Sequence, residues 1–281
     1  TSYYHGDGDV RQALDVLADS GGQIRDIIPF TFNFYTPGEG DTEFSIDLRE
    51  NNSADFSLLA VREIDKTDSG NIFTQMSLFH TEKNSEDRIV GNLGFGSRSL
   101  SEDKTFLTGF NFFMDYDDNK NARTSLGLEA RSAVLEFAYN QYFGIDDGVD
   151  EKVLDGYEML LASQIPFMHW ADLFLNTYEW KGRDRDDIKG IKMGSEMLLT
   201  PNINLELAFD DKDKKGLEDE WYAKIRFIHP ARTEPSLKDG FISSVAWKEN
   251  KDMSGDLLKK VKRNNKIMVE FKGASTISRT D

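Results

Sequence analysis

Short segments in which apolar and polar residues alternate make up most of the chain. The first thirty residues hold one helical pattern, at 10–18, which Gly21 and Gly22 end. From residue 43 to about 228 the period changes to two, with Gly, Asn, Asp or Pro between the segments. About twelve strands are predicted, near 43–50, 56–64, 72–80, 88–97, 105–115, 123–131, 134–143, 156–165, 172–180, 188–198, 203–210 and 220–228.

The spacing of these segments predicts an antiparallel sheet. Each strand with its connection takes about 15.5 residues, which leaves no room for crossover helices between parallel strands. One face of each strand is apolar and the other is polar or charged. The predicted apolar face includes Leu135, Phe137, Leu205, Leu207, Ile225 and Phe227. A soluble sandwich or barrel shows the same alternation, so the pattern alone does not choose between it and a transmembrane barrel.

The connections between the predicted strands favour the transmembrane barrel. One alternating set, at 98–104, 132–133, 166–171 and 199–202, is short and weakly charged. The other set, at 81–87, 116–122, 144–155, 181–187 and 211–219, is longer and rich in acidic residues. Outer-membrane barrels have short periplasmic turns and long polar external loops, whereas a soluble barrel has no reason to separate its connections in this way. The seven-residue connection at 65–71 is the exception.

The prediction is therefore an all-β protein, an antiparallel transmembrane β-barrel of about 12 strands. Residues 1–42 are predicted to form a periplasmic segment with the short helix, 43–228 the barrel, and 229–281 a linker or plug. Aromatic residues at strand ends are predicted to form interfacial girdles. These are Tyr142 with Phe143, Phe167 with Trp170, Tyr178 with Trp180, and Trp221 with Tyr222.

Composition narrows the function classes. The chain of 281 residues has 34 basic and 50 acidic side chains, a net charge of −16, and a mean hydropathy of −0.54. No window is apolar enough for a spanning helix, and the acidity argues against a nucleic-acid partner. The absence of cysteine excludes a disulfide scaffold and thiolate metal sites. A start at Thr1 without an apolar leader is expected of an exported chain whose signal peptide has been removed.

Four stretches resemble the inverse autotransporter β-domain of intimins and invasins, in the same order along the chain. They are 92–98 (NLGFGSR), 109–117 (GFNFFMDYD), 126–130 (LGLEA) and 155–158 (DGYE). The later residues 252–258 and 261–270 resemble the family's segment after the barrel. The resemblance covers about 43–272 and implies a twelve-stranded outer-membrane barrel whose C-terminal linker passes back through the pore to export a passenger.

The chain also departs from this family. Family members continue into adhesive domains, whereas this sequence ends at Asp281. Two expectations therefore stay open: a translocator that anchors and exports a C-terminal segment, and a passenger-free, porin-like channel whose tail acts as a plug or surface tag. The cell outer membrane of a Gram-negative bacterium is the expected location. Expected partners are outer-membrane lipid, lipopolysaccharide and the barrel-assembly machinery, with any surface partner left open.

Polar residues on the inward face are predicted to line the pore or contact the linker. They carry both signs of charge, which favours pairing inside a narrow pore over ion selectivity. The set is Asp47, Arg49, Asn111, Asp115, Glu129, Arg131, Glu136, Asn140, Lys192, Glu196, Glu206, Lys224 and Arg226. Two interpretations of Gly109 stay open: it lets a linker or plug lie close to the wall, or it faces a polar lumen filled with water.

The predicted linker follows a polar stretch with Pro230 and Pro235. Residues 252–262 are predicted to form a short helix and 267–271 an extended segment. Passage through the pore is favoured over a periplasmic tail, since extended chain covers about 3.3 Å per residue. The linker motif is Asp252, Met253, Leu257, Val261, Arg263, Asn264, Ile267 and Glu270.

No catalytic, cofactor or metal site is predicted. Oxygen-bearing residues alternate from Asp115 to Asn121, but Lys120 and Leu126 stand where a calcium loop needs Gly and Glu. A looser divalent-ion contact in the acidic loops is left open. His80 is the one histidine near the predicted external rim, and Ser77 lies on the opposite face of its strand.

Overall fold

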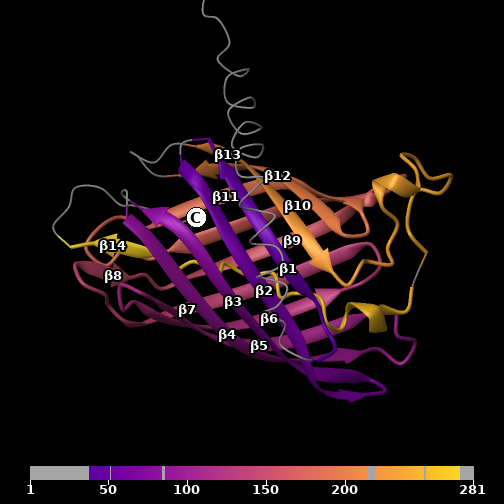
Figure 1. Ribbon diagram of the computed structural model, residues 1–281, viewed down its shortest axis with the longest axis horizontal. Coiled ribbons are helices and arrows are strands. Elements are labelled where there is room, and N and C mark those ends of the chain that lie inside the picture. The colour runs from indigo at the N-terminus through magenta and orange to yellow at the C-terminus, as the bar shows by residue number, and fades with distance from the viewer. Residues whose placement is uncertain (1–37, 51, 84–85, 214–218, 250, 273–281) are drawn as a thin grey trace, which may run out of the picture. The chain divides into compact units, whose positions relative to one another are not determined.

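A closed barrel of antiparallel strands forms the described part of the chain. The computed structural model describes residues 38–272 apart from 51, 84–85, 214–218 and 250. Within these residues twelve strands close the barrel in the order β1-β13-β12-β11-β10-β9-β7-β6-β5-β4-β3-β2 (Figure 1). The predicted helix at 10–18 lies outside the described residues.

Strands that are consecutive along the chain are neighbours in the barrel, with one interruption. They are β1 (Thr42–Arg49), β2 (Asn52–Thr67), β3 (Gly70–Lys83), β4 (Glu86–Leu100), β5 (Leu107–Asp117), β6 (Ala122–Arg131), β7 (Leu135–Asp146), β9 (Gly156–Ile165), β10 (Met168–Trp180), β11 (Ile188–Thr200), β12 (Ile203–Lys212) and β13 (Glu220–His229). The interruption is β8 (Glu151–Val153), which pairs with β14 (Val269–Phe271) in a separate two-stranded sheet. The predicted all-β barrel of about twelve strands is confirmed. The predicted division at 1–42, 43–228 and 229–281 stays a prediction.

The predicted seven-residue connection at 65–71 is wrong. β2 and β3 continue to pair as far as Thr67 and Gly70, so that only residues 68–69 connect them. Hydrogen bonds between the two backbones do not require apolar side chains, so the pairing continues through the exposed charged residues Asp65 and Lys66. The exception to the short-turn pattern therefore disappears.

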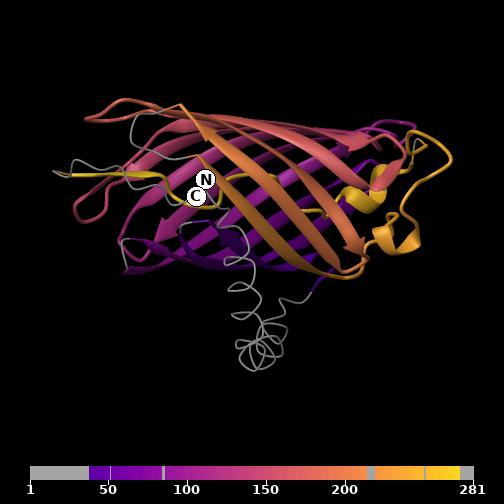
Figure 2. The same ribbon diagram turned by 90° about the horizontal axis from the view of Figure 1, so that it is seen from above.

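Connections of different character gather at the two ends of the barrel. The turn end carries 68–69, 101–106, 132–134, 166–167 and 201–202. The loop end carries 118–121, 147–155 and 181–187, the sheet formed by β8 and β14, and the connections from β1 to β2, from β3 to β4 and from β12 to β13. Figures 1 and 2 show β14 at the opposite end of the barrel from the orange and gold segment that follows β13.

The two faces of the wall reverse the arrangement of a soluble protein. Large apolar side chains point outward and are exposed, as at Leu161 (54%), Leu173 (56%) and Leu207 (44%). Polar side chains point inward and are buried, as at Asn111 and Asp115. A continuous exposed apolar wall is the feature that a lipid bilayer covers. None of the described residues forms a helix that is long and apolar enough to span a membrane.

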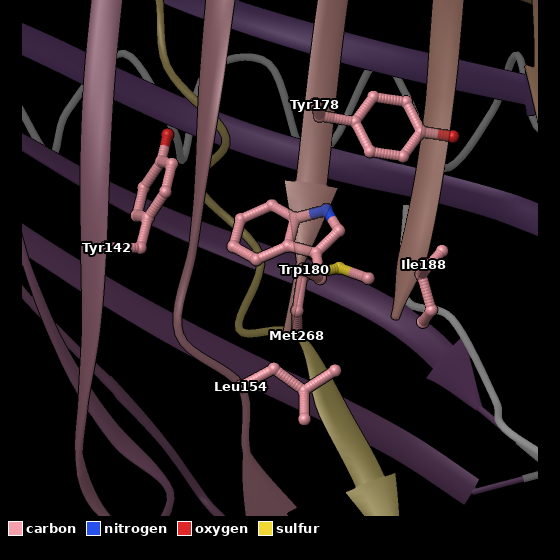
Figure 3. Close-up of a cluster of buried hydrophobic side chains, with 6 residues drawn as sticks. All are labelled: Tyr142, Leu154, Tyr178, Trp180, Ile188 and Met268. Carbon is pink, nitrogen blue, oxygen red and sulfur yellow. The ribbon is translucent and has the colours of Figure 1, made fainter. Parts of the chain in front are cut away.

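The predicted aromatic girdles are partly wrong. Phe143, Phe167 and Trp221 are exposed on the outside, as a girdle requires. Other members of the predicted pairs point inward, and three of them form a buried cluster (Figure 3). This cluster consists of Tyr142, Leu154, Tyr178, Trp180, Ile188 and Met268. Met268 comes from the C-terminal tail, so a second chain segment provides the apolar surroundings that strand alternation alone does not reveal.

An arginine at Leu207 should test the assignment of the two faces. Leu207 lies near the middle of β12 and points outward, so Leu207→Arg should lower the free energy of unfolding by about 2–4 kcal/mol in lipid vesicles. Lys224→Arg on β13 is the matched control, because Lys224 points inward and lies 3.0 Å from Asp47, and the change keeps its charge. Equal losses for both variants in urea titrations would contradict the assignment.

Candidate functional site

The segment after β13 lies first at the turn end. We call residues 230–249 the rim segment; it includes a 3-10 turn, η1 (Leu237–Asp239). Its Ala246 carbonyl accepts from the Phe167 N–H at 2.8 Å, and its Phe241 carbonyl accepts from Trp170 Nε1 at 2.9 Å. The rim segment is thus fixed to the β9–β10 turn and to the start of β10.

The next residues pack against another turn. A second 3-10 turn, η2 (Met253–Asp256), is capped by the Asp252 carboxylate, which accepts from the Ser254 N–H at 2.8 Å. The Met253 N–H donates to the Lys104 carbonyl at 2.8 Å, in the 101–106 connection. The side chains of Met253 and Leu257 pack on Leu107.

A charged cluster holds this part of the tail at the turn end. Lys259 Nζ lies 2.6 Å from Glu234 and 3.0 Å from Asp256, and Lys251 lies 3.2 Å from Glu234. Burial acts to raise the pKa of Glu234, but the two lysines outweigh it and hold the pKa well below its usual range. Glu234 is therefore ionised and joins the rim segment to the tail.

The predicted helix over 252–262 is wrong beyond Asp256. We call residues 257–268 the basic tail. Its carbonyl groups accept hydrogen bonds from wall side chains instead of from helical N–H groups. The pairs are Leu257 with Asn71 (3.2 Å) and Arg98 (2.6 Å), Lys259 with Arg98 (2.7 Å), Lys260 with Arg131 (2.8 Å), Lys262 with Asn140 (2.9 Å), Asn264 with Arg123 (2.8 Å) and Asn265 with Asn92 (2.9 Å).

Two N–H groups of the basic tail also have wall partners. The Val261 N–H donates to Gln75 Oε1 at 2.8 Å. The Asn264 N–H lies 2.8 Å from the Tyr142 hydroxyl and 2.6 Å from Glu158 Oε1. A segment without helix or strand needs such partners, because unpaired peptide groups are costly away from water.

Cations of the basic tail meet carboxylates of the wall. Lys260 lies 2.6 Å from Glu43 and Lys266 lies 2.6 Å from Asp55. Lys262 pairs with Glu196 and lies 3.9 Å from Glu136. These carboxylates belong to β1, β2, β7 and β11, whereas the side chains that bind the tail's peptide groups belong to β3, β4, β6, β7 and β9.

Arg263 makes the most completely buried of these contacts. Its guanidinium lies 2.7 Å from Asp115 Oδ2 and 4.2 Å from the centre of the Phe113 ring. Asp115 also accepts from Asn92 at 2.8 Å and from Arg123 at 2.9 Å. The Phe113 ring lies flat across Gly94, where a Cβ atom would come within 2.3 Å of the ring.

At the loop end the tail becomes a strand. Val269, Glu270 and Phe271 of β14 pair with Val153, Lys152 and Glu151 of β8. The Glu270 carboxylate accepts from the backbone N–H groups of Arg183 and Asp184, each at 3.1 Å. The tail's contacts therefore run from the 101–106 turn at one end to the 147–155 and 181–187 loops at the other.

The predicted pore-lining residues divide into two groups. Asp115, Arg131, Glu136, Asn140 and Glu196 contact the basic tail, as described above. The rest contact other wall residues. Most of them form ion pairs: Asp47 with Lys224, Arg49 with Glu220 (2.8 Å), Glu129 with Arg98 (2.7 Å) and Arg131 (2.8 Å), and Arg226 with Glu196 and Glu206 (2.7 Å each). Lys192 lies 5.5 Å from the centre of the Tyr178 ring. Asn111 lies beside Gly127.

Residues of the linker motif contact the wall in different ways. Asp252, Met253, Leu257, Arg263, Asn264 and Glu270 make the contacts given above. Val261 packs with Leu59, Phe73 and Phe113. Ile267 packs with Phe79, Val90 and Val153.

Sequence reasoning missed several wall residues that hold the tail. They are Glu43, Asp55, Asn71, Gln75, Asn92, Arg98 and Arg123. Arg123 shares the period of two with Glu129 and Arg131, which were predicted, so the same rule identifies it. One of the two interpretations of Gly109 was that it makes room for the linker. Instead, a Cβ there would come within 2.5 Å of Glu129, a wall residue.

The alternating oxygen-bearing residues after Asp115 hydrogen-bond to protein groups, and Asn119 and Asn121 both donate to Glu151. Asp117 accepts from Asn121 Nδ2 at 2.8 Å and lies 3.3 Å from Arg88. The described residues contain no group of three or more His, Cys, Asp or Glu side chains placed to hold a metal ion. Ser77, inside the wall, has its hydroxyl 2.6 Å from Asn92 Oδ1.

The basic tail leaves space on one side of the barrel interior. A cavity of about 190 Å³ lies between the tail and the wall. Its charged lining includes Glu43, Asp47, Lys192, Glu206 and Lys224. On this side Glu43 of β1 and Glu196 of β11 pair with the tail's Lys260 and Lys262.

Comparisons with known proteins identify the type of barrel. The model of the family described as "Inverse autotransporter, beta-domain" matches residues 26–265. A solved chain described as "Unveiling the Mechanism Behind the in-meso Crystallization of Membrane Proteins" has 17% identity and a TM-score of 0.66, covering 83% of this chain and 100% of that one. An outer membrane channel from Pseudomonas putida F1 has 8% identity and a TM-score of 0.51, covering 69% and 96%. These two structures share the fold, and no curated protein matches.

An alanine at Gly94 should test how closely the wall fits Arg263. Gly94→Ala displaces the Phe113 ring on which Arg263 stacks, and overpacking of this kind costs about 1–3 kcal/mol. Gly91→Ala on the same strand is the matched control, because a Cβ there would be 3.8 Å from the Tyr116 carbonyl oxygen and 3.9 Å from Leu78, which are ordinary contact distances. Urea unfolding in vesicles should show a loss for Gly94→Ala alone. Indistinguishable variants would mean that the ring moves without cost.

Proposed function

Because the chain belongs to the inverse autotransporter β-domain family, we propose that it exports the chain that follows its basic tail and anchors it at the surface of a Gram-negative bacterium. The single observation that carries this proposal is the course of the tail's contacts. They begin beside the 101–106 turn, continue along the inward-facing wall and end on β8.

The two ends of the barrel supply the direction of export. Short turns mark the periplasmic side of outer-membrane barrels and long loops the external side. Between Met253 and Val269 the tail runs from the turn end to the loop end. An extended chain of that many residues, at about 3.3 Å per residue, is longer than the thickness of a bilayer core, about 30 Å. This course of the tail supports export of the chain beyond Phe271 to the outside of the cell.

The role is mechanical and not catalytic. Support for this comes from Arg98, Arg123, Arg131 and Asn140, which bind the tail's carbonyl groups and so hold a chain in place. Insertion by the barrel-assembly machinery and contact with lipopolysaccharide belong to the same proposal.

An epitope tag placed after Asp281 should test the export. It should be labelled by antibody on intact cells, as should a tag inserted after Gly148 in the loop between β7 and β9. A tag beside Ser132, in a turn, is the control and should be labelled only after the outer membrane has been permeabilised. Labelling of the Asp281 tag only in permeabilised cells would refute export.

A passenger-free channel is the second candidate, and the cavity beside the tail favours it. The cavity of about 190 Å³ is lined by charged groups of both signs, including Glu43 and Glu196, which pair with lysines of the tail. A plugged channel of this type has a small water-filled passage.

Truncation should separate a plug from an empty pore. Removal of residues 251–281 uncovers the inward-facing wall, so single-channel conductance in planar bilayers should rise severalfold. Removal of 273–281 alone is the control and should leave conductance unchanged, because β14 and the basic tail remain. Heat-modifiable migration in gels shows that each variant is folded. Equal conductance of the two truncated forms would contradict the placement of the tail in the pore.

A further inference from the structure

The rim segment carries an exposed apolar patch that neither export nor conduction uses. We call Phe241, Ile242, Val245 and Trp247 the rim patch. Their side chains are 60%, 69%, 51% and 50% exposed, all within seven consecutive residues. Apolar side chains gathered in this way on a folded surface mark an interaction site.

Hydrogen bonds fix the rim patch to the end of the barrel. Besides the bonds to Phe167 and Trp170 already described, the Ser243 N–H donates to the Phe167 carbonyl at 2.7 Å. Gln164 donates to the Ala246 carbonyl at 3.1 Å and accepts from the Lys248 N–H at 2.8 Å. The Phe241 ring centre lies 5.6 Å from that of Trp170. Backbone bonds on both sides of the patch hold its side chains toward the outside.

The patch is bonded to a turn that joins two strands of the apolar outer wall. The turn contains Phe167, which is itself 47% exposed, and Leu161 and Leu173 on the adjoining strands are exposed apolar residues of the wall. Exposed polar residues flank it, with Lys238 and Asp239 before it and Glu249 after it. Figures 1 and 2 show the rim segment at the end of the barrel opposite β14.

We propose that the rim patch inserts into the lipid at the turn end and so anchors the start of the tail in the membrane interface. Tryptophan favours this interface, because its apolar ring meets acyl chains while its indole N–H meets headgroups, and phenylalanine enters the acyl boundary beside it. The anchor holds the chain between β13 and η2 against the rim, so that the basic tail enters from a fixed point. The proposal depends on the barrel lying in a membrane and is independent of export.

Spin labels at single cysteines should test the lipid contact. The chain has no cysteine, so Ile242→Cys gives one attachment site in the full-length protein, reconstituted in phosphatidylcholine–phosphatidylglycerol vesicles. Oxygen concentrates among acyl chains and a polar nickel complex concentrates in water. The ratio of oxygen to nickel collision rates at Ile242 should be closer to that of Leu207→Cys, on the outward wall, than to that of Lys238→Cys, in the exposed 3-10 turn.

A second readout uses the native tryptophan. Vesicles of brominated lipid should quench the wild type more than Trp247→Phe, and the difference should be comparable to that caused by Trp221→Phe, which removes an outward-facing ring. High nickel accessibility at Ile242 would place the patch in water, and low accessibility to both reagents would place it under protein. Either result, or equal quenching of wild type and Trp247→Phe, would overturn the proposal.

Discussion

The hydrogen-bonding needs of a bare peptide backbone control the interior of this barrel. The basic tail has neither helix nor ladder over most of its length, so its carbonyl and N–H groups depend on the wall. Arg98, Arg123 and Arg131 donate to its carbonyls, and carboxylates in turn orient these arginines: Glu129 binds Arg98 and Arg131, and Asp115 binds Arg123. These three arginines are therefore tolerated away from water because a carboxylate lies beside each of them and each also has a tail carbonyl to bind.

The tail is held differently on its two sides. Planar guanidinium and amide groups of β3, β4, β6 and β7 bind its backbone, which fixes its position whatever its side chains are. Toward β1, β2 and β11 it extends lysines, whose long stems reach Glu43, Asp55 and Glu196. The cavity lies on this second side. The wall thus carries carboxylates where a basic segment passes.

Alternation and turn residues were sufficient to predict the barrel, because a wall between lipid and a polar interior imposes a period of two on every strand. They also placed Asp115, Asn140 and Glu196 on the inward face. Alternation did not show which inward residues contact the tail, because that depends on how the irregular tail is turned about its own axis inside the barrel. Tyr142 and Trp180 were assigned to the lipid interface since rings at strand ends usually lie there, and the structure turns them inward around Met268. The helix predicted over 252–262 failed for a related reason: local propensity competes there with donors from Arg98 and Arg131.

The pairing of β14 with β8 determines how the molecule carries a load. A pull applied to Lys272 along the axis of β14 would load the hydrogen bonds to β8 in shear, together with the bonds from the 181–187 loop to Glu270. The ion pairs of Lys266 and Arg263 lie behind these contacts along the chain. Tension in that direction is therefore borne first by the last element of the tail, and the interior contacts are loaded after it.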